Sequence, residues 1–415
     1  MDDLQSLQRD YDRVKSSGLK LNMERGQPGD RNFDLSNGLL SAVTEKDLLT
    51  PTGVAIRNYP GGVAGLPEAR ELFSTILRVE PSQMFVGGNS SLKILADLLL
   101  WARVCGLRDR ERPWRDGTEK FIVTVPGYDR HFTLLATLGF EMVSVGMTPE
   151  GPDIDAIERI AGGDASVKGL LFVPTYSNPT GETVSNRVVH RLAAMKTAAP
   201  DFTIFADDAY AVHHLAASPV VPDNLLATAA QSGNPDRVFL FGSTSKITFA
   251  GAGIGFMATG ESNLAHISRL FTAAYIGPNK VEQYRHVKFL SSYPGGIPGL
   301  MEQHAVLLRP KFAAVQEVLQ RELGGSGLAT WTNPHGGYFV SFDTSLPVAK
   351  RVVELAKGAG VALTAAGSTY PHGVDPEDRN IRLAPTRPPE NEVRKAMEVV
   401  ALCVKLASAE LQKRK

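Results

Sequence analysis

Short runs of strand-forming residues alternate with helical stretches through the middle of this sequence, and that alternation constrains the fold more than any other feature. Strands joined by crossover helices run parallel and are buried on both faces. Helical stretches such as 89–103 and 185–197 separate the runs. The five runs, rich in β-branched and aromatic residues, lie at 83–86, 121–125, 169–173, 202–206 and 237–241. We therefore predict an α/β fold with a mostly parallel central sheet.

The two ends of the chain follow other patterns. Residues 1–17 have apolar side chains at helical spacing, and 21–67 are rich in Gly and Pro, which predicts a helix followed by a long loop. Beyond Pro310 we expect helices at 311–323, 347–358 and 389–412 with strands at 338–342 and 381–383. We predict a large domain at 51–305 and a smaller α+β domain at 306–415, which the N-terminal helix and loop of residues 1–50 join.

The charge balance excludes several classes of partner. Among 415 residues, 44 Lys and Arg face 44 Asp and Glu, so the formal net charge is zero. Electrostatic binding of nucleic acid or of a membrane surface needs a basic surplus. No apolar run approaches the roughly 20 residues of a membrane span, and the N-terminus has no secretory signal pattern. We expect no nucleic-acid partner and no membrane partner.

The cysteine content bears on the compartment. Cys105 and Cys403 lie far apart and have no metal-ligand spacing, so the sequence predicts neither a disulfide framework nor a metal site. We expect a cytoplasmic location.

Polar or Gly-rich clusters follow each predicted strand. The carboxyl ends of parallel strands meet at one edge of the sheet, where ligands bind, so these clusters should converge. The first of them opens a helix, and free backbone N–H groups there favour an anion such as phosphate. The clusters are 87–91, 126–128, 174–181, 207–210 and 242–246.

In their order and spacing, these residues resemble the motifs of fold-type I pyridoxal phosphate (PLP) enzymes of the class I/II aminotransferase family. The resemblance covers nearly the whole chain and is closest to the branch named for its similarity to MocR-type aminotransferase domains. The matching motifs are the Y-P-x-x-G-type segment at 58–70, N-P-T-G at 178–181, D-x-x-Y at 207–210, S-x-S-K at 243–246 and I-R-L at 381–383. The resemblance implies a homodimer with shared active sites. It also implies transfer of an amino group from an L-amino acid to a 2-oxo acid, with aspartate and 2-oxoglutarate as the best candidates.

The resemblance assigns the chemistry to a few residues. Lys246 would join covalently to the cofactor aldehyde and afterwards move a proton. Asp207 would keep the pyridine nitrogen protonated, so that the ring can accept electrons. Asn178 and Tyr210 would hydrogen-bond the phenolic oxygen of the ring, and Tyr128 would stack on the ring.

The remaining assignments concern the two anionic groups. Arg382 would grip the substrate α-carboxylate with its planar guanidinium, and the backbone of Gly26 would approach the same carboxylate. Tyr59 would reach the phosphate of the neighbouring subunit. The phosphate of the same subunit would lie on Gly88, Asn89, Ser90, Ser243 and Ser245.

One position departs from the family pattern. The family usually continues the lysine motif into G-x-R-x-G, whose arginine pairs with the phosphate, whereas Gly253 stands in the arginine's place here. Arg285, Lys280 or a residue of the second subunit could supply the missing charge.

Several motifs allow other interpretations. Residues 251–255 superficially resemble a dinucleotide fingerprint but lack a preceding strand and a following acid, which favours a tight turn. Residues 243–246 also match the S-x-x-K motif of serine acyl-transfer enzymes. The other motifs of those enzymes stand in reversed order or are missing, so this function is not favoured. The adjacent His213 and His214 are interpreted as structural residues, not as metal ligands. Asp208, beside Asp207, is likewise interpreted as structural, not as one of a catalytic acid–base pair.

Two other classes of function are compatible with these motifs. A ligand-sensing regulator of the MocR type would carry a helix-turn-helix domain ahead of the aminotransferase-like part, and only about 20 residues precede Leu21. Another PLP enzyme of the same fold, whether a β-elimination lyase, a decarboxylase or an alanine or aromatic aminotransferase, starts from the same cofactor adduct, and the motifs do not exclude it. An aspartate substrate would need a cation for its side-chain carboxylate, and Arg25, Arg31 and Arg285 are the candidates.

Overall fold

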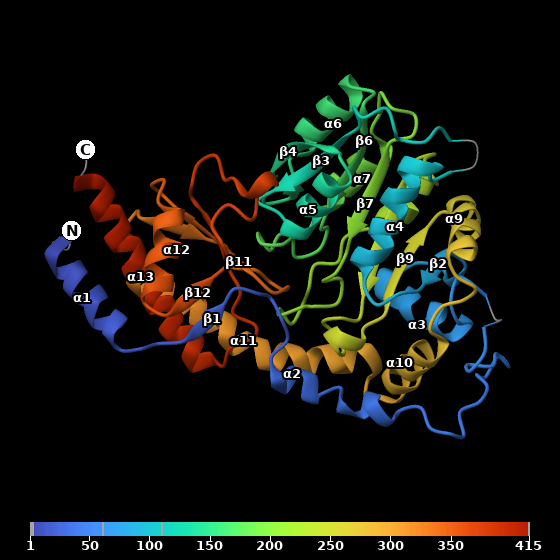
Figure 1. The fold of residues 1–415 in the computed structure, drawn as a ribbon, viewed down its shortest axis with the longest axis horizontal. Coiled ribbons are helices and arrows are strands. Elements are labelled where there is room, and N and C mark those ends of the chain that lie inside the picture. The colour runs from blue at the N-terminus through green and yellow to red at the C-terminus, as the bar shows by residue number, and fades with distance from the viewer. Residues whose placement is uncertain (1–3, 60–61, 109–110, 414–415) are drawn as a thin grey trace.

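A computed structural model describes residues 4–59, 62–108 and 111–413. Its central feature is an eight-stranded sheet (Figure 1). In spatial order the strands are β2 (Met84–Val86), β9 (Gly255–Thr259), β8 (Val238–Ser243), β7 (Thr203–Asp207), β6 (Val167–Phe172), β3 (Lys120–Val125), β4 (Glu141–Thr148) and β5 (Gly151–Pro152). Strands β8, β7, β6, β3 and β4 run parallel, whereas β9 is antiparallel to both of its neighbours and β5 is antiparallel to β4. The predicted α/β fold is confirmed, and all five predicted strands form.

Alternate residues of each central strand enter two separate cores. In β7, Ile204 and Ala206 pack on one face, and Phe205 packs on the other. The first face is covered by α3 (Pro67–Leu77), α6 (Ile154–Gly163), α7 (Asn186–Ala194), α8 (Leu225–Gln231) and α10 (Lys280–Ser292). The second face is covered by α4 (Ser91–Val104), α5 (Asp129–Thr137) and α9 (Glu261–Ala274). Burial on both faces explains the continuous apolar runs of these strands.

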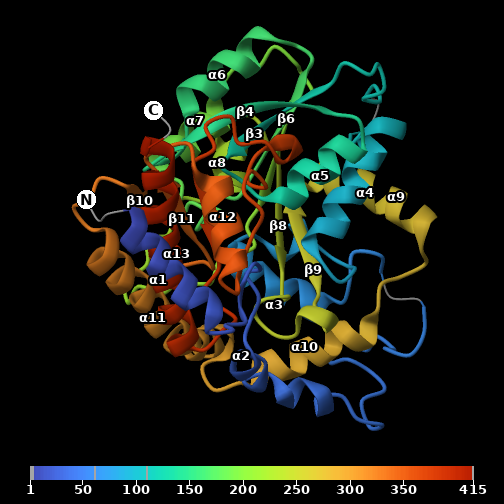
Figure 2. The same cartoon turned by 60° about the vertical axis from the view of Figure 1, so that its left-hand side comes forward.

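A third core holds the two ends of the chain together. An antiparallel sheet of β10 (Ala329–Trp331), β11 (Val340–Thr344) and β13 (Asn380–Leu383) packs with α12 (Ala349–Gly358) and α13 (Glu390–Lys413). Helix α1 (Leu4–Ser16) lies on α13, and both are seen side by side in Figure 2. Strand β1 (Leu21–Met23) pairs in parallel with β12 (Val361–Leu363). The domain boundaries near residues 50 and 305 stay a prediction.

Helix α11 (Gly296–Leu323) is longer than predicted. The expectation of a helix starting at 311 was wrong, because the helix continues through Pro310. Proline inside a helix costs about 3 kcal/mol or more. Burial of both halves of the helix offsets that cost: Ile297 and Leu300 pack into the first core, and residues from Leu308 onward pack into the third.

The segment predicted as a loop at 21–67 contains, besides β1, the short helix α2 (Asp30–Asp34) and a 3₁₀ turn at Asn37–Ser41. Asn32 stabilises α2, because its side-chain oxygen accepts a hydrogen bond from the backbone N–H of Gly29 at 3.3 Å.

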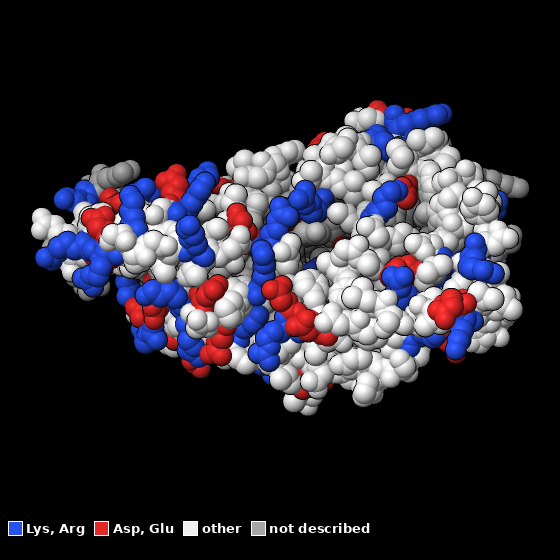
Figure 3. Space-filling model, turned by 60° about the horizontal axis from the view of Figure 1, so that its bottom comes forward, with Lys and Arg blue, Asp and Glu red and all other residues white. Residues whose placement is uncertain are grey.

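Basic and acidic side chains are interspersed over the face in Figure 3. None of the described helices has the length and apolar character needed to cross a bilayer.

Candidate active site

A cavity of about 520 Å³ lies beyond the carboxyl ends of the parallel strands. The wall is completed by the segment around Gly26, by Phe339 and by β13. The predicted site residues that line it are Gly26, Ser90, Tyr128, Asn178, Asp207, Tyr210, Ser243, Ser245, Lys246 and Arg382. The structure therefore brings together residues that lie more than 350 positions apart in the chain.

Lys246 follows β8 and extends into this cavity. Its amine lies 5.1 Å from the centroid of the Tyr210 ring. Burial lowers the pKa of the amine, an effect that Asp207 opposes and Arg382 reinforces. A lowered pKa increases the fraction of neutral amine, which is the form that attacks an aldehyde.

Asp207 ends β7 and is only 4% exposed. Its Oδ2 atom lies 3.0 Å from Nε2 of His131, whereas its buried Oδ1 has no hydrogen-bond partner among the described residues. An unpaired buried carboxylate oxygen is costly. Asp207 is therefore suited to receive a donor from a ligand in the cavity.

The aromatic and amide groups lie around the same point. Burial raises the pKa of Tyr128 to about 12 and raises the pKa of Tyr210 well above its ordinary value, so both hydroxyls stay protonated. Asn178 is 3% exposed, and its Oδ1 accepts a hydrogen bond from Nη1 of Arg382 at 3.4 Å. These three residues supply hydrogen-bonding groups in a water-poor environment.

Arg382 lies on β13 and is nearly buried. Its guanidinium is 4.9 Å from the centroid of the Phe339 ring, and Nη1 donates to Oδ1 of Asp129 at 3.1 Å. Its buried Nε has no partner among the described residues. Because a guanidinium binds carboxylates through two parallel N–H groups, Arg382 retains capacity for a second carboxylate.

Gly26 must be glycine for the cavity wall to have this shape. A Cβ atom at this position would lie 2.3 Å from Cζ of Phe339. The main chain at Gly26 can therefore pack closely on the same aromatic ring that supports Arg382.

Serine side chains line one end of the cavity. Ser90 caps α4 and accepts a hydrogen bond from the backbone N–H of Lys93, Ser243 ends β8, and Ser245 follows two residues later. Gly88 and Asn89 directly precede Ser90, are exposed and are not among the residues that line the cavity. Gly88 has φ +74°, which favours glycine there.

Gly253 packs on this end of the site. A Cβ atom at Gly253 would lie 2.9 Å from Oγ of Ser245 and 3.2 Å from its backbone nitrogen. An arginine at this backbone position would displace the segment that carries Ser245 and Lys246.

The other candidate cations lie elsewhere. Neither Arg285 nor Lys280 is among the described residues that line the cavity. Arg285 pairs with Glu282 at 3.0 Å, and Nζ of Lys280 donates to the carbonyl oxygen of Tyr59 at 3.1 Å. Tyr59 itself is 68% exposed and does not line the cavity of its own chain.

Sequence reasoning missed three neighbours of Tyr128. Asp129 and Arg130 line the cavity, and His131 contacts Asp207. All three occupy the first turn of α5, directly after a cluster that the sequence had marked. Their position next to that cluster was the available signal.

The remaining polar residues have other environments. Nε2 of His213 lies 3.4 Å from the carbonyl oxygen of Lys246, and Nδ1 of His214 lies 2.8 Å from the Tyr176 hydroxyl. Burial raises the pKa of Asp208 to about 6. The described residues contain no group of three or more His, Cys, Asp or Glu side chains placed to hold a metal ion.

Comparison with known proteins places this geometry in a family. The aspartate aminotransferase family matches residues 1–415. An aspartate aminotransferase of Corynebacterium glutamicum is 44% identical over 408 residues, which cover 98% of this chain and 94% of that protein.

Solved structures agree with the family match. The crystal structure of an aspartate transaminase from Corynebacterium glutamicum has a TM-score of 0.95 at 43% identity, covering 98% of this chain and 96% of that one. An α-aminoadipate aminotransferase of Thermus thermophilus shares the fold at 19% identity, with a TM-score of 0.76 and coverage of 97% and 95%. The chain belongs to the aspartate aminotransferase family and is an aminotransferase.

Proposed function

We propose that this aminotransferase uses PLP to transfer the amino group of L-aspartate to 2-oxoglutarate. The observation that carries the substrate assignment is a cavity with two further arginines, Arg25 and Arg130, besides Arg382. A dicarboxylic substrate needs a cation at each end. Of the cations that the sequence suggested for the side-chain carboxylate, Arg25 lines the cavity, whereas Arg31 and Arg285 do not.

The residues present fit PLP. The unpaired Oδ1 of Asp207 suits the protonated ring nitrogen, and the serines at 90, 243 and 245 suit the phosphate. When bound, PLP accepts the electron pair that is released when the Cα–H bond breaks. Asn178, Tyr210 and Tyr128 would hold the ring.

Lys246 would act first as nucleophile and then as base. Its lowered pKa increases the fraction of neutral amine that is able to attack. Once the substrate amine has replaced it, Nζ of Lys246 would take the proton from the substrate Cα and deliver it to C4′ of the cofactor, the carbon on the other side of the amine nitrogen.

Arg382 would position the substrate by its α-carboxylate. In the free enzyme, Nη1 of Arg382 donates a hydrogen bond to Oδ1 of Asp129 at 3.1 Å, so one of the guanidinium donors already has a partner. A substrate carboxylate would add hydrogen bonds to the remaining donors, with the backbone of Gly26 close by.

We further propose that Gly88, Asn89 and Ser90 meet the phosphate through backbone and side-chain donors. Tyr59 would act at the phosphate of a second subunit in a homodimer, which its exposure supports. Exposed apolar side chains lie in the same segment or near it, as expected of a subunit interface: Leu40, Leu48, Leu49 and Ile276. The two free cysteines support a reducing, cytoplasmic compartment.

The test is a substrate screen on the purified enzyme. Aspartate, glutamate, alanine and aromatic amino acids are offered with 2-oxoglutarate, and both 2-oxo acid and ammonia are measured. The proposal predicts oxaloacetate from aspartate only when 2-oxoglutarate is present. Ammonia release without a second oxo acid would contradict transfer, and preference for an apolar amino acid would contradict the assignment to aspartate.

The roles of Arg25 and Arg130 can be separated in the same assay. Replacing either by Gln should raise KM for aspartate at least tenfold if it binds the side-chain carboxylate, while KM for alanine changes less than twofold. An equal rise in KM for aspartate and for alanine would show that the arginine does not bind the side-chain carboxylate of aspartate.

A further inference from the structure

A second cavity, of about 470 Å³, shares no lining residue with the active-site cavity. Three parts of the chain meet there: 29–32, 306–311 and 387–390. Two of these stretches, 29–32 and 387–390, lie only a few residues from Gly26 and Arg382 in the active-site wall. The hydroxyl of Thr386 donates to the carbonyl oxygen of Gln27 at 2.8 Å and joins two of these stretches.

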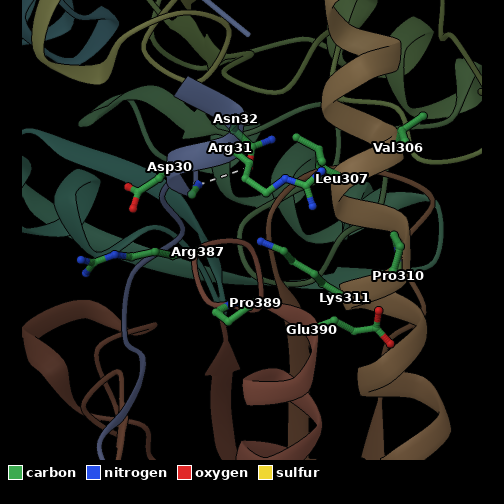
Figure 4. Close-up of a pocket in the computed structure, with 11 residues that line it drawn as sticks. Asp30, Arg31, Asn32, Val306, Leu307, Pro310, Lys311, Arg387, Pro389 and Glu390 are labelled. Carbon is green, nitrogen blue, oxygen red and sulfur yellow. Dashed lines mark hydrogen bonds between the residues drawn. The ribbon is translucent and has the colours of Figure 1, made fainter. Parts of the chain in front are cut away.

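Two cations face each other in this cavity. Figure 4 shows Arg31 from α2 and Lys311 from α11 extending toward each other, whereas Asp30 and Arg387 point to the opposite side. Lys311 donates to the carbonyl oxygen of Thr386 at 2.6 Å, which leaves two of its three N–H groups for other acceptors. Among the described residues, Arg31 has neither an ion pair nor a hydrogen bond to its guanidinium.

The nearby carboxylates do not compensate this pair. Glu390 accepts a hydrogen bond from Arg394 at 2.9 Å, and Asp30 also lines a neighbouring cavity together with Arg387. Burial and the charge of Arg31 lower the pKa of Lys311 to about 8. Two like charges held together in a partly buried place disfavour each other unless an anion lies between them.

The rest of the wall limits the size and character of an occupant. Val306, Leu307 and Pro310 give it an apolar side. The opposite side is held firmly, because buried Asn32 bonds Nδ1 of His304 at 3.0 Å, and Nε2 of His304 lies 2.9 Å from the carbonyl oxygen of Ile247. A small ligand with concentrated negative charge fits this lining.

We propose that Arg31 and Lys311 form a binding site for a small dianion, either inorganic phosphate or a short dicarboxylate, separate from the active site. The ligand would accept hydrogen bonds from both cations and rest against Val306, Leu307 and Pro310. It would join α2 to α11 behind the active-site wall.

The test is calorimetric titration of the PLP-loaded enzyme with inorganic phosphate and, separately, with succinate, in a buffer free of other multivalent anions. Arg31→Gln and Lys311→Met are compared with the wild type, and Arg387→Gln serves as the matched control. Succinate can also bind at Arg382, but that component is common to all four proteins, so the difference between them reports the second cavity.

For at least one of the two anions, we expect saturable binding that is weakened tenfold or more by Arg31→Gln and by Lys311→Met and less than twofold by Arg387→Gln. The anion that shows this pattern identifies the ligand class. If both anions bind the four proteins equally, or neither binds the wild type beyond its active-site component, the proposal is overturned. Arg31 is exposed, so its variant carries the test even if Lys311→Met does not fold.

This outcome is independent of the proposed substrate, because the readout is binding and not turnover.

Discussion

His131 and Asp207 lie in contact beneath the active-site cavity, with 3.0 Å between Nε2 of the histidine and Oδ2 of the carboxylate. The contact fixes the carboxylate so that Oδ1, the unpaired oxygen, is the one left for a ligand. Asp207 ends a buried strand and His131 lies in the first turn of α5, so the pair joins the central sheet to a helix that covers its second face.

Loss of His131 should therefore weaken catalysis without emptying the cavity. A hydrogen bond to a charged group contributes about 1.5–3 kcal/mol. His131→Ala should lower kcat by roughly 10- to 100-fold through misplacement of Asp207, and it should shift the visible absorption of bound PLP. His131→Gln retains a donor and should recover part of both effects; if it is as impaired as the alanine variant, orientation by hydrogen bonding is not the cause.

Gly26→Ala should destabilise the fold and deform the active site. The added methyl group would collide with the Phe339 ring, and overpacking of this kind costs about 1–3 kcal/mol. Urea denaturation measures the loss. Gly251→Ala is the matched control, because a Cβ atom at Gly251 meets nothing within 4 Å, and this variant should keep wild-type stability. Equal stability of both variants would refute the packing argument.

The Arg382–Asp129 contact predicts that substitutions at its two residues change substrate binding in opposite directions. Arg382→Lys cannot reproduce the two-pronged grip, so KM for the amino acid should rise at least tenfold. Asp129→Asn removes the charge that competes with the substrate carboxylate, and KM should fall a fewfold. Steady-state kinetics at fixed 2-oxoglutarate would decide; a higher KM for Asp129→Asn would show that Asp129 orients Arg382 and does not compete with the substrate.

Asp208 predicts a pH dependence of stability. Its pKa is raised by burial to about 6, above the unfolded value near 3.8. Between these two pH values the folded state binds more protons than the unfolded state. The stabilisation that protonated Asp208 contributes is therefore fully present below about pH 4 and is lost as pH rises through 6. Relative to Asp208→Asn, the wild type should lose up to about 3 kcal/mol between pH 4 and 7. Parallel stability profiles for the two proteins would exclude a raised pKa.

The sequence predicted the parallel core because its strands are buried on both faces and so are continuously apolar, as in 202–206. It did not reveal β4, an edge-side strand in which Glu141 and Ser144 interrupt the apolar pattern, or β9, whose run follows the Gly-rich segment at 251–255. These strands form because their neighbours supply partners, which is a tertiary effect.

The site was predictable where chemistry demands a motif and not where packing supplies the partner. Lys246 and Arg382 stand in recognisable runs, and the structure brings both to one cavity. His131 stands in no motif, because its contact with Asp207 arises only when α5 packs on the sheet. The structure explains why the arginine that usually pairs with the phosphate is absent. Gly253, which stands in its place, packs so closely on Ser245 that a side chain would not fit there.

Lys246 is expected to carry the cofactor in this cavity. Borohydride reduction of the PLP-loaded enzyme followed by peptide mass spectrometry tests it directly, because reduction makes the bond between lysine and PLP permanent. We predict a pyridoxyl group on Lys246, and neither this modification nor the visible absorption of lysine-bound PLP in Lys246→Ala. A pyridoxyl group on another lysine, or a wild-type protein that never takes up PLP, would show that Lys246 does not hold the cofactor.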